Sequence, residues 1–296
     1  METAKNRLVV FCLWAVLLLV SDLPNILLVN WQGADPGWLP WAKIGLLLGL
    51  LMLCRLWEAI RAAWKFAFVF LVFLLANWAV DGIVRSQAWR SAFNQEPLSY
   101  TAFYLSFQTL DVLRALLVIA ALWWLLRDWK AFFLKKGRLD APIEPVRWLG
   151  IGQGESWWVF GWIFTACASA IIVIPLALSV PLNAEAFSRA LPLLPVAILL
   201  AALNAFAEEA YYRAPILATL AGLVGKNQAL LMACVFFGLS HYLYGSPPGV
   251  LGFALTAFLA FLLGKSMLET RGMGWAWFMH FVPDVFIFFS YALAWG

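Results

Sequence analysis

Long apolar segments dominate this sequence of 296 residues, and each is about as long as a bilayer is thick. A helix of about 20 apolar residues spans the hydrocarbon core, where only helices and closed barrels satisfy every backbone hydrogen bond. The pattern predicts an all-α fold, a polytopic membrane helical bundle with about eight or nine transmembrane helices. The apolar runs cover residues 8–29, 42–60, 64–80, 101–126, 157–180, 190–224, 227–243, 249–268 and 274–295.

The composition supports a membrane protein surrounded by the lipid bilayer. Hydrophobic residues make up 64% of the chain and charged residues 12%, which differs from soluble globular domains. Lys and Arg exceed Asp and Glu by only 20 to 16, so we expect no nucleic-acid partner. The four cysteines lack CxxC spacing, and we interpret them as small core residues rather than as disulfides, metal ligands or nucleophiles. The oligomeric state is left open.

Basic residues alternate between the predicted loops and indicate an orientation. Lys5 and Arg7 precede the first run, residues 30–41 contain no Lys or Arg, and residues 127–156 hold six. Since cytoplasmic loops are enriched in Lys and Arg, we place the N-terminus in the cytoplasm, in the inner or plasma membrane if the source is bacterial. Residues 129–134 are interpreted as ordinary loop, with a short interfacial helix on anionic lipid as the alternative.

We see no internal repeat, low-complexity tract or soluble domain in the chain. We therefore expect one continuous membrane domain with two parts. Residues 1–156 provide the N-terminal transmembrane helices and the basic cytoplasmic loop, and residues 157–296 form a helical core that carries most of the candidate functional side chains.

The two histidines of the chain, His241 and His280, both lie in apolar runs, as does Glu208. An ionisable side chain at bilayer depth costs roughly 2.5 to 3.5 kcal/mol when it is charged and central. A group of such residues therefore indicates chemistry or transport. Asp284 follows His280 by four residues and shares its helical face. We predict that Glu208, His241, His280 and Asp284 surround one polar cavity.

Helical spacing divides the two adjacent glutamates. Glu209 and Arg213 are four residues apart and are expected to form a structural ion pair. Glu208 points about 100° away from Glu209, which leaves its carboxylate available for chemistry, with Asn204 one turn before it. On another helix, Phe237 is expected to pack beside His241, and the neighbouring Gly238 would permit close helix approach.

Three motifs in the second part of the chain resemble the CAAX protease and bacteriocin-processing family, also called Abi, which includes the type II CAAX prenyl endopeptidases. The family pattern is EExxxR, then FxxxH, then HxxxN or a close variant. This chain has EEAYYR at residues 208–213, FGLSH at 237–241 and HFVPD at 280–284, in the same order. The resemblance covers about residues 190–295.

The resemblance implies an α-helical bundle around a conical cavity and a glutamic-type intramembrane endopeptidase, without a cofactor, acting on a membrane-associated peptide or protein. Glu208 would be the general base for a water held jointly with His241. His280 and residue 284 would stabilise the oxyanion, while Glu209 and Arg213 would hold the shape of the site.

Asp284 departs from the prenyl endopeptidases, which carry Asn at this position. An ionised Asp cannot donate a hydrogen bond to an oxyanion. Either Asp284 is kept protonated by apolar surroundings, or it orients His280 by accepting its N–H. We favour the second interpretation.

Two alternatives stay open from the sequence. Glu208, His241, His280 and Asp284 offer the ligand types of a zinc site, which would make the protein a metal-dependent membrane protease, although no HExxH motif is present. The other alternative is a non-proteolytic membrane protein: a transporter, or an immunity or scaffold member of the family. A transport path could be lined by two further polar pairs, Asp111 with Arg114 and Asp22 with Asn25. For both pairs we favour the simpler interpretation, in which the two members pair with each other.

The predicted orientation places the site residues at different depths. At 1.5 Å per residue, Glu208 would lie roughly 20 to 27 Å from the outer face and His241 about 9 Å from it. Tilted helices or kinks at prolines are therefore needed to bring them together: Pro192, Pro195 and Pro215.

Overall fold

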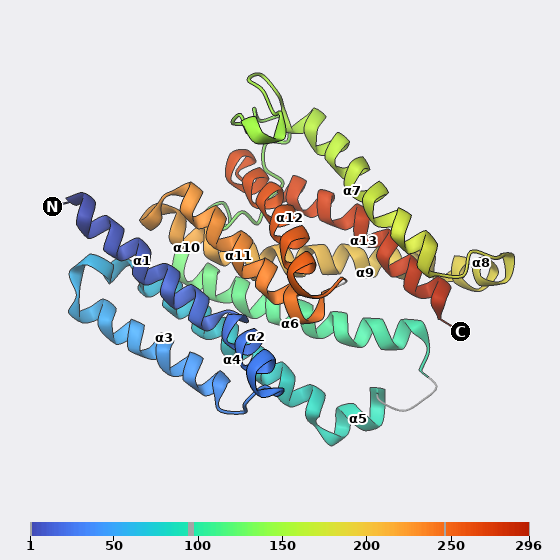
Figure 1. Cartoon of the computed structure of the whole chain (residues 1–296), viewed down its shortest axis with the longest axis horizontal. Coiled ribbons are helices and arrows are strands. Elements are labelled where there is room, and N and C mark those ends of the chain that lie inside the picture. Colours follow the sequence, from blue (N-terminus) through green and yellow to red (C-terminus); the bar gives the residue numbers. More distant parts are fainter. Residues whose placement is uncertain (1, 94–97, 246, 296) are drawn as a thin grey trace.

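The computed structural model describes residues 2–93, 98–245 and 247–295, with side chains from residue 7 onward. Residues 1, 94–97, 246 and 296, and the side chain of Lys5, lie outside this part. The described chain consists of helices and connecting loops and contains no strand, only two isolated β-bridges. The N-terminus and the C-terminus lie near opposite ends of the long axis (Figure 1). The predicted all-α fold is confirmed.

The bounds of the helices follow the apolar runs closely. In chain order they are α1 (Glu2–Val20), α2 (Leu23–Gln32), α3 (Leu39–Leu56), α4 (Trp64–Arg85), α5 (Gln87–Phe93), α6 (Tyr100–Leu126), α7 (Trp157–Ser179), α8 (Ala184–Ala190), α9 (Leu194–Glu208), α10 (Ala214–Val224), α11 (Lys226–Tyr244), α12 (Gly249–Thr270) and α13 (Gly274–Ala294). Three short 3-10 helices, η1 (Glu58–Ala63), η2 (Arg147–Leu149) and η3 (Leu191–Leu193), and one π-helical turn, η4 (Glu209–Arg213), complete the described elements.

Seven helical segments of the described chain are long and apolar enough to cross a membrane, or eight if the bent pair of α1 and α2 is one span. This is close to the predicted eight or nine. The helix predicted over 227–243 is present as α11, but it is not among the seven. The protein is therefore an integral, multi-pass membrane protein.

The first apolar run forms two helices rather than one, because α1 and α2 are bent by 50°. Pro24 has no N–H to continue the helical hydrogen bonds. The hydroxyl of Ser21 donates to the carbonyl of Leu18 at 2.7 Å and accepts from the N–H of Leu23 at 3.1 Å. These local bonds replace helical ones at the break.

The run over 190–224 is also divided. Pro192 and Pro195 lie in the first turns of η3 and α9, where a missing N–H costs no helical bond. The third proline, Pro215, acts inside the segment, since it cannot donate to the carbonyl four residues before it. The preceding turn widens, and the N–H of Ala214 donates to the carbonyl of Glu209. This is the π-helical turn η4.

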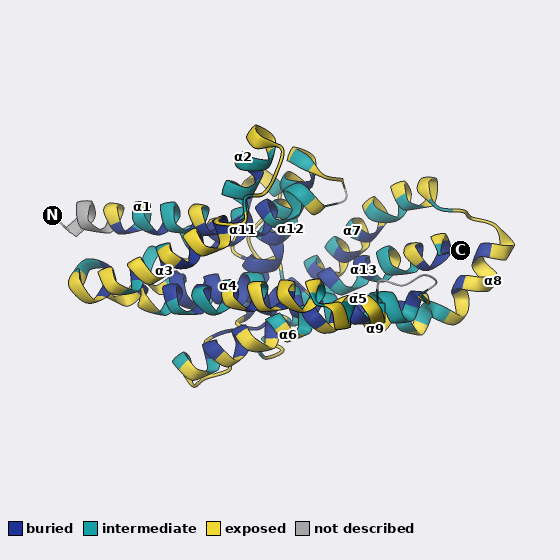
Figure 2. Ribbon diagram, turned by 90° about the horizontal axis from the view of Figure 1, so that it is seen from below, coloured by how far each residue is buried: buried dark blue, intermediate teal, exposed yellow. Residues whose placement is uncertain are grey.

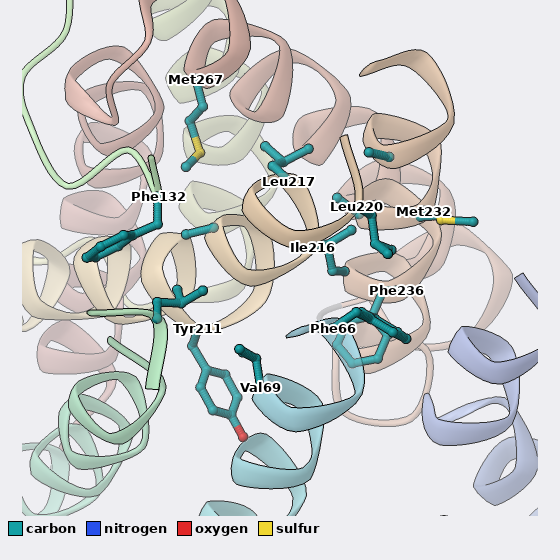
Figure 3. Close-up of a cluster of buried hydrophobic side chains, with 14 of the residues drawn as sticks. Phe66, Val69, Phe132, Tyr211, Ile216, Leu217, Leu220, Met232, Phe236 and Met267 are labelled. Atoms are coloured by element: carbon teal, nitrogen blue, oxygen red, sulfur yellow. The ribbon is translucent and has the colours of Figure 1, made fainter. Parts of the chain in front are cut away.

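The helices form a bundle in which α13 lies against both α7 and α9, α11 lies against α10 and α12, and α6 lies between α4 and α9. Buried residues gather around α4, α11 and α13, whereas exposed residues follow α3 and α8 (Figure 2). A large apolar cluster joins α4, η4, α10 and α11 (Figure 3), with Phe66, Val69, Tyr211, Ile216, Leu220 and Phe236 among its labelled side chains.

Small residues permit the closest helix contact, as predicted for Gly238. A Cβ atom at this glycine would lie 2.8 Å from the Phe253 ring and 2.9 Å from its carbonyl oxygen. Lipid-embedded helices associate largely through such close packing. The contact holds α11, which carries His241, against α12.

The basic segment 127–156 contains no α-helix, so the interfacial helix considered for 129–134 is wrong. Its backbone instead pairs with the turn between α12 and α13: the N–H of Arg138 donates to Thr270 at 2.8 Å, and that of Met273 to Lys135 at 2.9 Å. Gly137 and Gly272 allow the approach, since a Cβ at either would overlap the other's backbone. The basic segment 127–156 therefore lies against the turn that carries Arg271.

Candidate active site

His280 on α13 lies among three carboxylates. Its Nδ1 is 2.9 Å from Oε1 of Glu209, while its Nε2 is 3.5 Å from Oε2 of Glu208 and 3.6 Å from Oδ2 of Asp284. The imidazole is buried. These contacts join α13 to the end of α9 and to η4, so segments about 70 residues apart in the sequence meet at one ring.

Asn204 connects two of these carboxylates. Its Nδ2 lies 2.9 Å from Oδ2 of Asp284 and 3.5 Å from Oε1 of Glu208. The second contact follows from the helix, because Asn204 precedes Glu208 by one turn of α9. The first crosses to α13. Asn204 thus presents an amide between the two carboxyl groups.

Glu209 and Arg213 form the predicted ion pair, and both side chains are fully buried. The guanidinium also lies 4.0 Å from the centroid of the Phe237 ring, an arrangement that stabilises a cation that has left water. Nε and Nη2 of Arg213 have no hydrogen-bond partner among the described residues. The buried guanidinium of Arg213 is therefore stabilised by the Glu209 carboxylate and by the face of the Phe237 ring.

The Glu209 carboxylate has a second partner that the sequence did not indicate. Its Oε1 contacts Arg213 and also Nδ1 of His280. Because a carboxylate paired with a guanidinium is ionised and can only accept, we assign a proton to Nδ1. Glu209 therefore occupies the orienting position that we expected of Asp284, which lies instead at Nε2 and accepts from Asn204.

The two glutamates differ in exposure as their helical positions predict. The Glu208 side chain is 22% exposed and that of Glu209 is not exposed at all. Glu208 is the last residue of α9, and Glu209 begins the π-helical turn. Such turns occur frequently at functional sites. Of the two adjacent carboxylates, only Glu208 is open to water or a substrate.

The ring of Phe237 lies between His241 and the cluster of carboxylates around His280. Nδ1 of His241 lies 3.0 Å from the carbonyl oxygen of Phe237 and 3.1 Å from the hydroxyl of Ser240, and its Nε2 has no hydrogen-bond partner in the described part of the chain. The Phe237 ring packs beside His241 as predicted, with centroids 4.3 Å apart, and lies 6.4 Å from the ring of His280. Within the described residues, no carboxylate oxygen lies within 4.0 Å of a nitrogen of His241.

The remaining polar candidates pair with residues other than Glu208, His280 and Asp284. Arg114 pairs with Asp111 as predicted and lies 3.8 Å from Asp81. The predicted pairing of Asp22 with Asn25 is wrong, because Asn25 instead accepts from Lys43 at 2.5 Å and donates to Asp35 at 2.8 Å (two residues that were not singled out). Across the described chain, no group of three or more His, Cys, Asp or Glu is arranged to hold a metal ion.

Comparison with known families gives one match. The family model described as Type II CAAX prenyl endopeptidase Rce1-like matches residues 189–286, about a third of the chain, which includes all three motifs. No curated protein and no solved structure matches the chain. The match supports a protease of the CAAX type for this part of the chain. It confirms that this part of the chain is similar to the type II CAAX prenyl endopeptidases.

Proposed function

We propose that the protein is a glutamic-type intramembrane endopeptidase that hydrolyses a peptide bond of a membrane-associated protein or peptide. The observation that carries this proposal is the Glu208 carboxylate, partly exposed inside an apolar bundle and 3.5 Å from the imidazole of His280. In water-poor surroundings a carboxylate beside an imidazole suits proton transfer. The family match supports the protease class independently of this geometry.

In the proposed reaction, Glu208 takes a proton from a water molecule that His241 also holds through its Nε2. The resulting hydroxide forms a bond to the carbonyl carbon of the substrate, and the carbonyl oxygen becomes an oxyanion. When the C–N bond breaks, Glu208 returns the proton to the leaving nitrogen. The products are a carboxylic acid and an amine, so one water molecule is consumed for each bond cut.

We propose that the oxyanion is stabilised by the Nε2–H of a protonated His280 and by the amide of Asn204. Three carboxylates around one ring favour the imidazolium, which donates from both nitrogens. The Asn204 amide would supply the neutral donor that Asp284 cannot provide when ionised, with Asp284 holding this amide in place at 2.9 Å.

Exchanging these two side chains tests this arrangement. We expect Asn204→Ala to lower kcat about 10²-fold to 10³-fold, the usual effect of removing one oxyanion donor. The exchanged variant, Asn204→Asp with Asp284→Asn, keeps one amide and one carboxylate and is expected to recover most of this loss. Steady-state kinetics of the three proteins give the comparison, and an exchanged variant as slow as Asn204→Ala would contradict the role of the amide.

The proposed function is tested by comparing the protein termini of membranes from cells that carry either the intact protein or Glu208→Gln. New C-termini or N-termini are expected with the intact protein and with the control variant, but not with Glu208→Gln. Glu185→Gln is the matched control, because Glu185 is exposed on α8 and pairs only with Arg189. Identical termini in all three samples would remove the protease proposal.

Metal independence is a separate proposal. If Glu208 activates water without a metal ion, turnover is expected to persist after treatment with a strong zinc chelator. Loss of turnover with the chelator, and recovery when zinc is added back, would instead support the metal-dependent alternative. A chelator-resistant activity that also disappears in Glu208→Gln separates the two mechanisms.

We also propose that the N-terminus and residues 127–156 face the cytoplasm, and that residues 157–296 form the catalytic core while residues 1–156 supply the remaining helices. The alternation of basic residues between the loops supports this orientation.

A further inference from the structure

A groove of about 260 Å³ lies between α7 and α13, beside the basic segment 127–156. It is smaller than the roughly 300 to 1,000 Å³ of typical small-molecule pockets, and it suits a length of hydrocarbon chain rather than a whole compact ligand. Its lining is aromatic and apolar with one cationic side chain. The side chains that line it are those of Lys136, Leu139, Trp158, Trp162, Trp275, Trp277 and Phe278.

The tryptophans of this groove fall into two kinds. The indole N–H of Trp275 donates to the carbonyl of Leu139 at 2.8 Å, and that of Trp277 donates to Ala202 at 3.1 Å. Trp158 and Trp162 are half exposed, at 51% and 50%, and their N–H groups have no protein acceptor among the described residues. Trp275 and Trp277 therefore hold the groove in shape, whereas Trp158 and Trp162 offer N–H donors along an apolar wall.

The shape of the groove is built into the backbone. A Cβ atom at Gly161 would lie 2.4 Å from the ring of Trp275, and one at Gly274 would lie 2.4 Å from the carbonyl oxygen of Lys136. The N–H of Gly274 donates to this same oxygen at 3.1 Å. The backbone of Lys136 is therefore held at one end of the groove, while its side chain is exposed.

We propose that this groove binds one anionic phospholipid, with an acyl chain along Trp158 and Trp162 and the phosphate near Lys136. Tryptophan at helix ends favours the headgroup zone of a bilayer, and basic side chains beside a groove between helices attract anionic headgroups. The apolar wall of the groove thus suits an acyl chain, and the indole N–H groups and Lys136 suit the polar headgroup with its phosphate.

The site lies on the helix that carries His280. Trp277 and Phe278 precede His280 on α13, and the Trp277 indole is bonded to α9 two residues before Asn204. A bound lipid would therefore contact α13, which carries His280 and Asp284. The proposal does not depend on proteolysis, because it concerns lipid binding alone.

Native mass spectrometry of the full chain in detergent tests this proposal, with phosphatidylglycerol and phosphatidylcholine of identical acyl chains as probes. One phosphatidylglycerol is expected to remain bound in preference to phosphatidylcholine. Lys136→Ala is expected to lower this preference about fivefold, the effect of one cation at an anionic surface. Lys135→Ala is the matched control, since Lys135 does not line the groove. Trp162→Ala is expected to weaken the binding of both lipids.

Three results would overturn the proposal. One is equal retention of the two lipids by the intact protein. Another is an equal loss of preference in Lys135→Ala and Lys136→Ala, which would indicate a general field of the basic segment rather than a site. The third is displacement of the bound lipid by a lipidated peptide that the protein cleaves, because the groove would then hold substrate. Circular dichroism and gel filtration confirm that each variant is folded.

Discussion

Glu208→Gln is expected to lower kcat/KM for peptide hydrolysis by about 10²-fold to 10⁴-fold, the range attributed to a positioned general base. The amide keeps the size of the side chain and its contact with Asn204, but it cannot take a proton from water. A cleaved peptide identified from the comparison of termini serves as the substrate, and the rate of its cleavage in mixed micelles is the measurement.

The interpretation of this loss depends on an unchanged fold. Since Glu208 is partly exposed and its polar contacts with His280 and Asn204 are each 3.5 Å long, we expect Glu208→Gln to leave the free energy of unfolding within about 0.5 kcal/mol of the original. A variant that keeps full activity would exclude Glu208 as the base. A variant that unfolds would show that the carboxylate is structural, and the proposed mechanism would fail in that case too.

Glu209→Leu is expected to destabilise the protein by about 3 to 5 kcal/mol, because it leaves the guanidinium of Arg213 buried without its carboxylate. The Phe237 ring alone does not compensate for this loss. Equilibrium unfolding in mixed micelles with increasing denaturing detergent gives the difference. A change below about 1 kcal/mol would show that the pair is reached by water and contributes little.

The double variant Glu209→Leu with Arg213→Met separates stability from catalysis. Replacing both members of a buried pair by apolar side chains is often neutral, so most of the stability is expected to return. Activity is not expected to return, because His280 has lost the acceptor at its Nδ1. Recovery of both properties would show that Glu209 acts only through Arg213 and does not orient the imidazole.

The sequence predicts the contacts that arise within one helix. The pairing of Glu209 with Arg213, the approach of Asn204 to Glu208 and the packing of Phe237 beside His241 all follow from a separation of four residues. The helices themselves follow from the length of the apolar runs. In each case a short-range rule is sufficient, because lipid surroundings leave the backbone few alternatives to the helix.

Contacts between helices were not predictable from these rules. The bond between Glu209 and His280 joins residues 71 positions apart, and nothing in the motif spacing distinguishes it from a bond to Asp284. The pairing of Asn25 with Lys43 likewise depends on the bend between α1 and α2. The bonds that the N–H of Met273 donates to the carbonyls of Phe133 and Lys135 tie the end of residues 129–134 to the turn between α12 and α13. These features depend on tertiary packing, which a single sequence does not reveal.

The wide turn η4 makes the length of the chain at this point as important as its composition. It accommodates one more residue per turn than a regular helix would, so deleting a residue such as Ala210 would restore regular winding. The later residues of that span would keep nearly the same orientation relative to α9, because the wide turn already absorbs one extra residue. Arg213 would then follow Glu209 by three positions rather than four, so the wide turn sets the spacing of the buried ion pair.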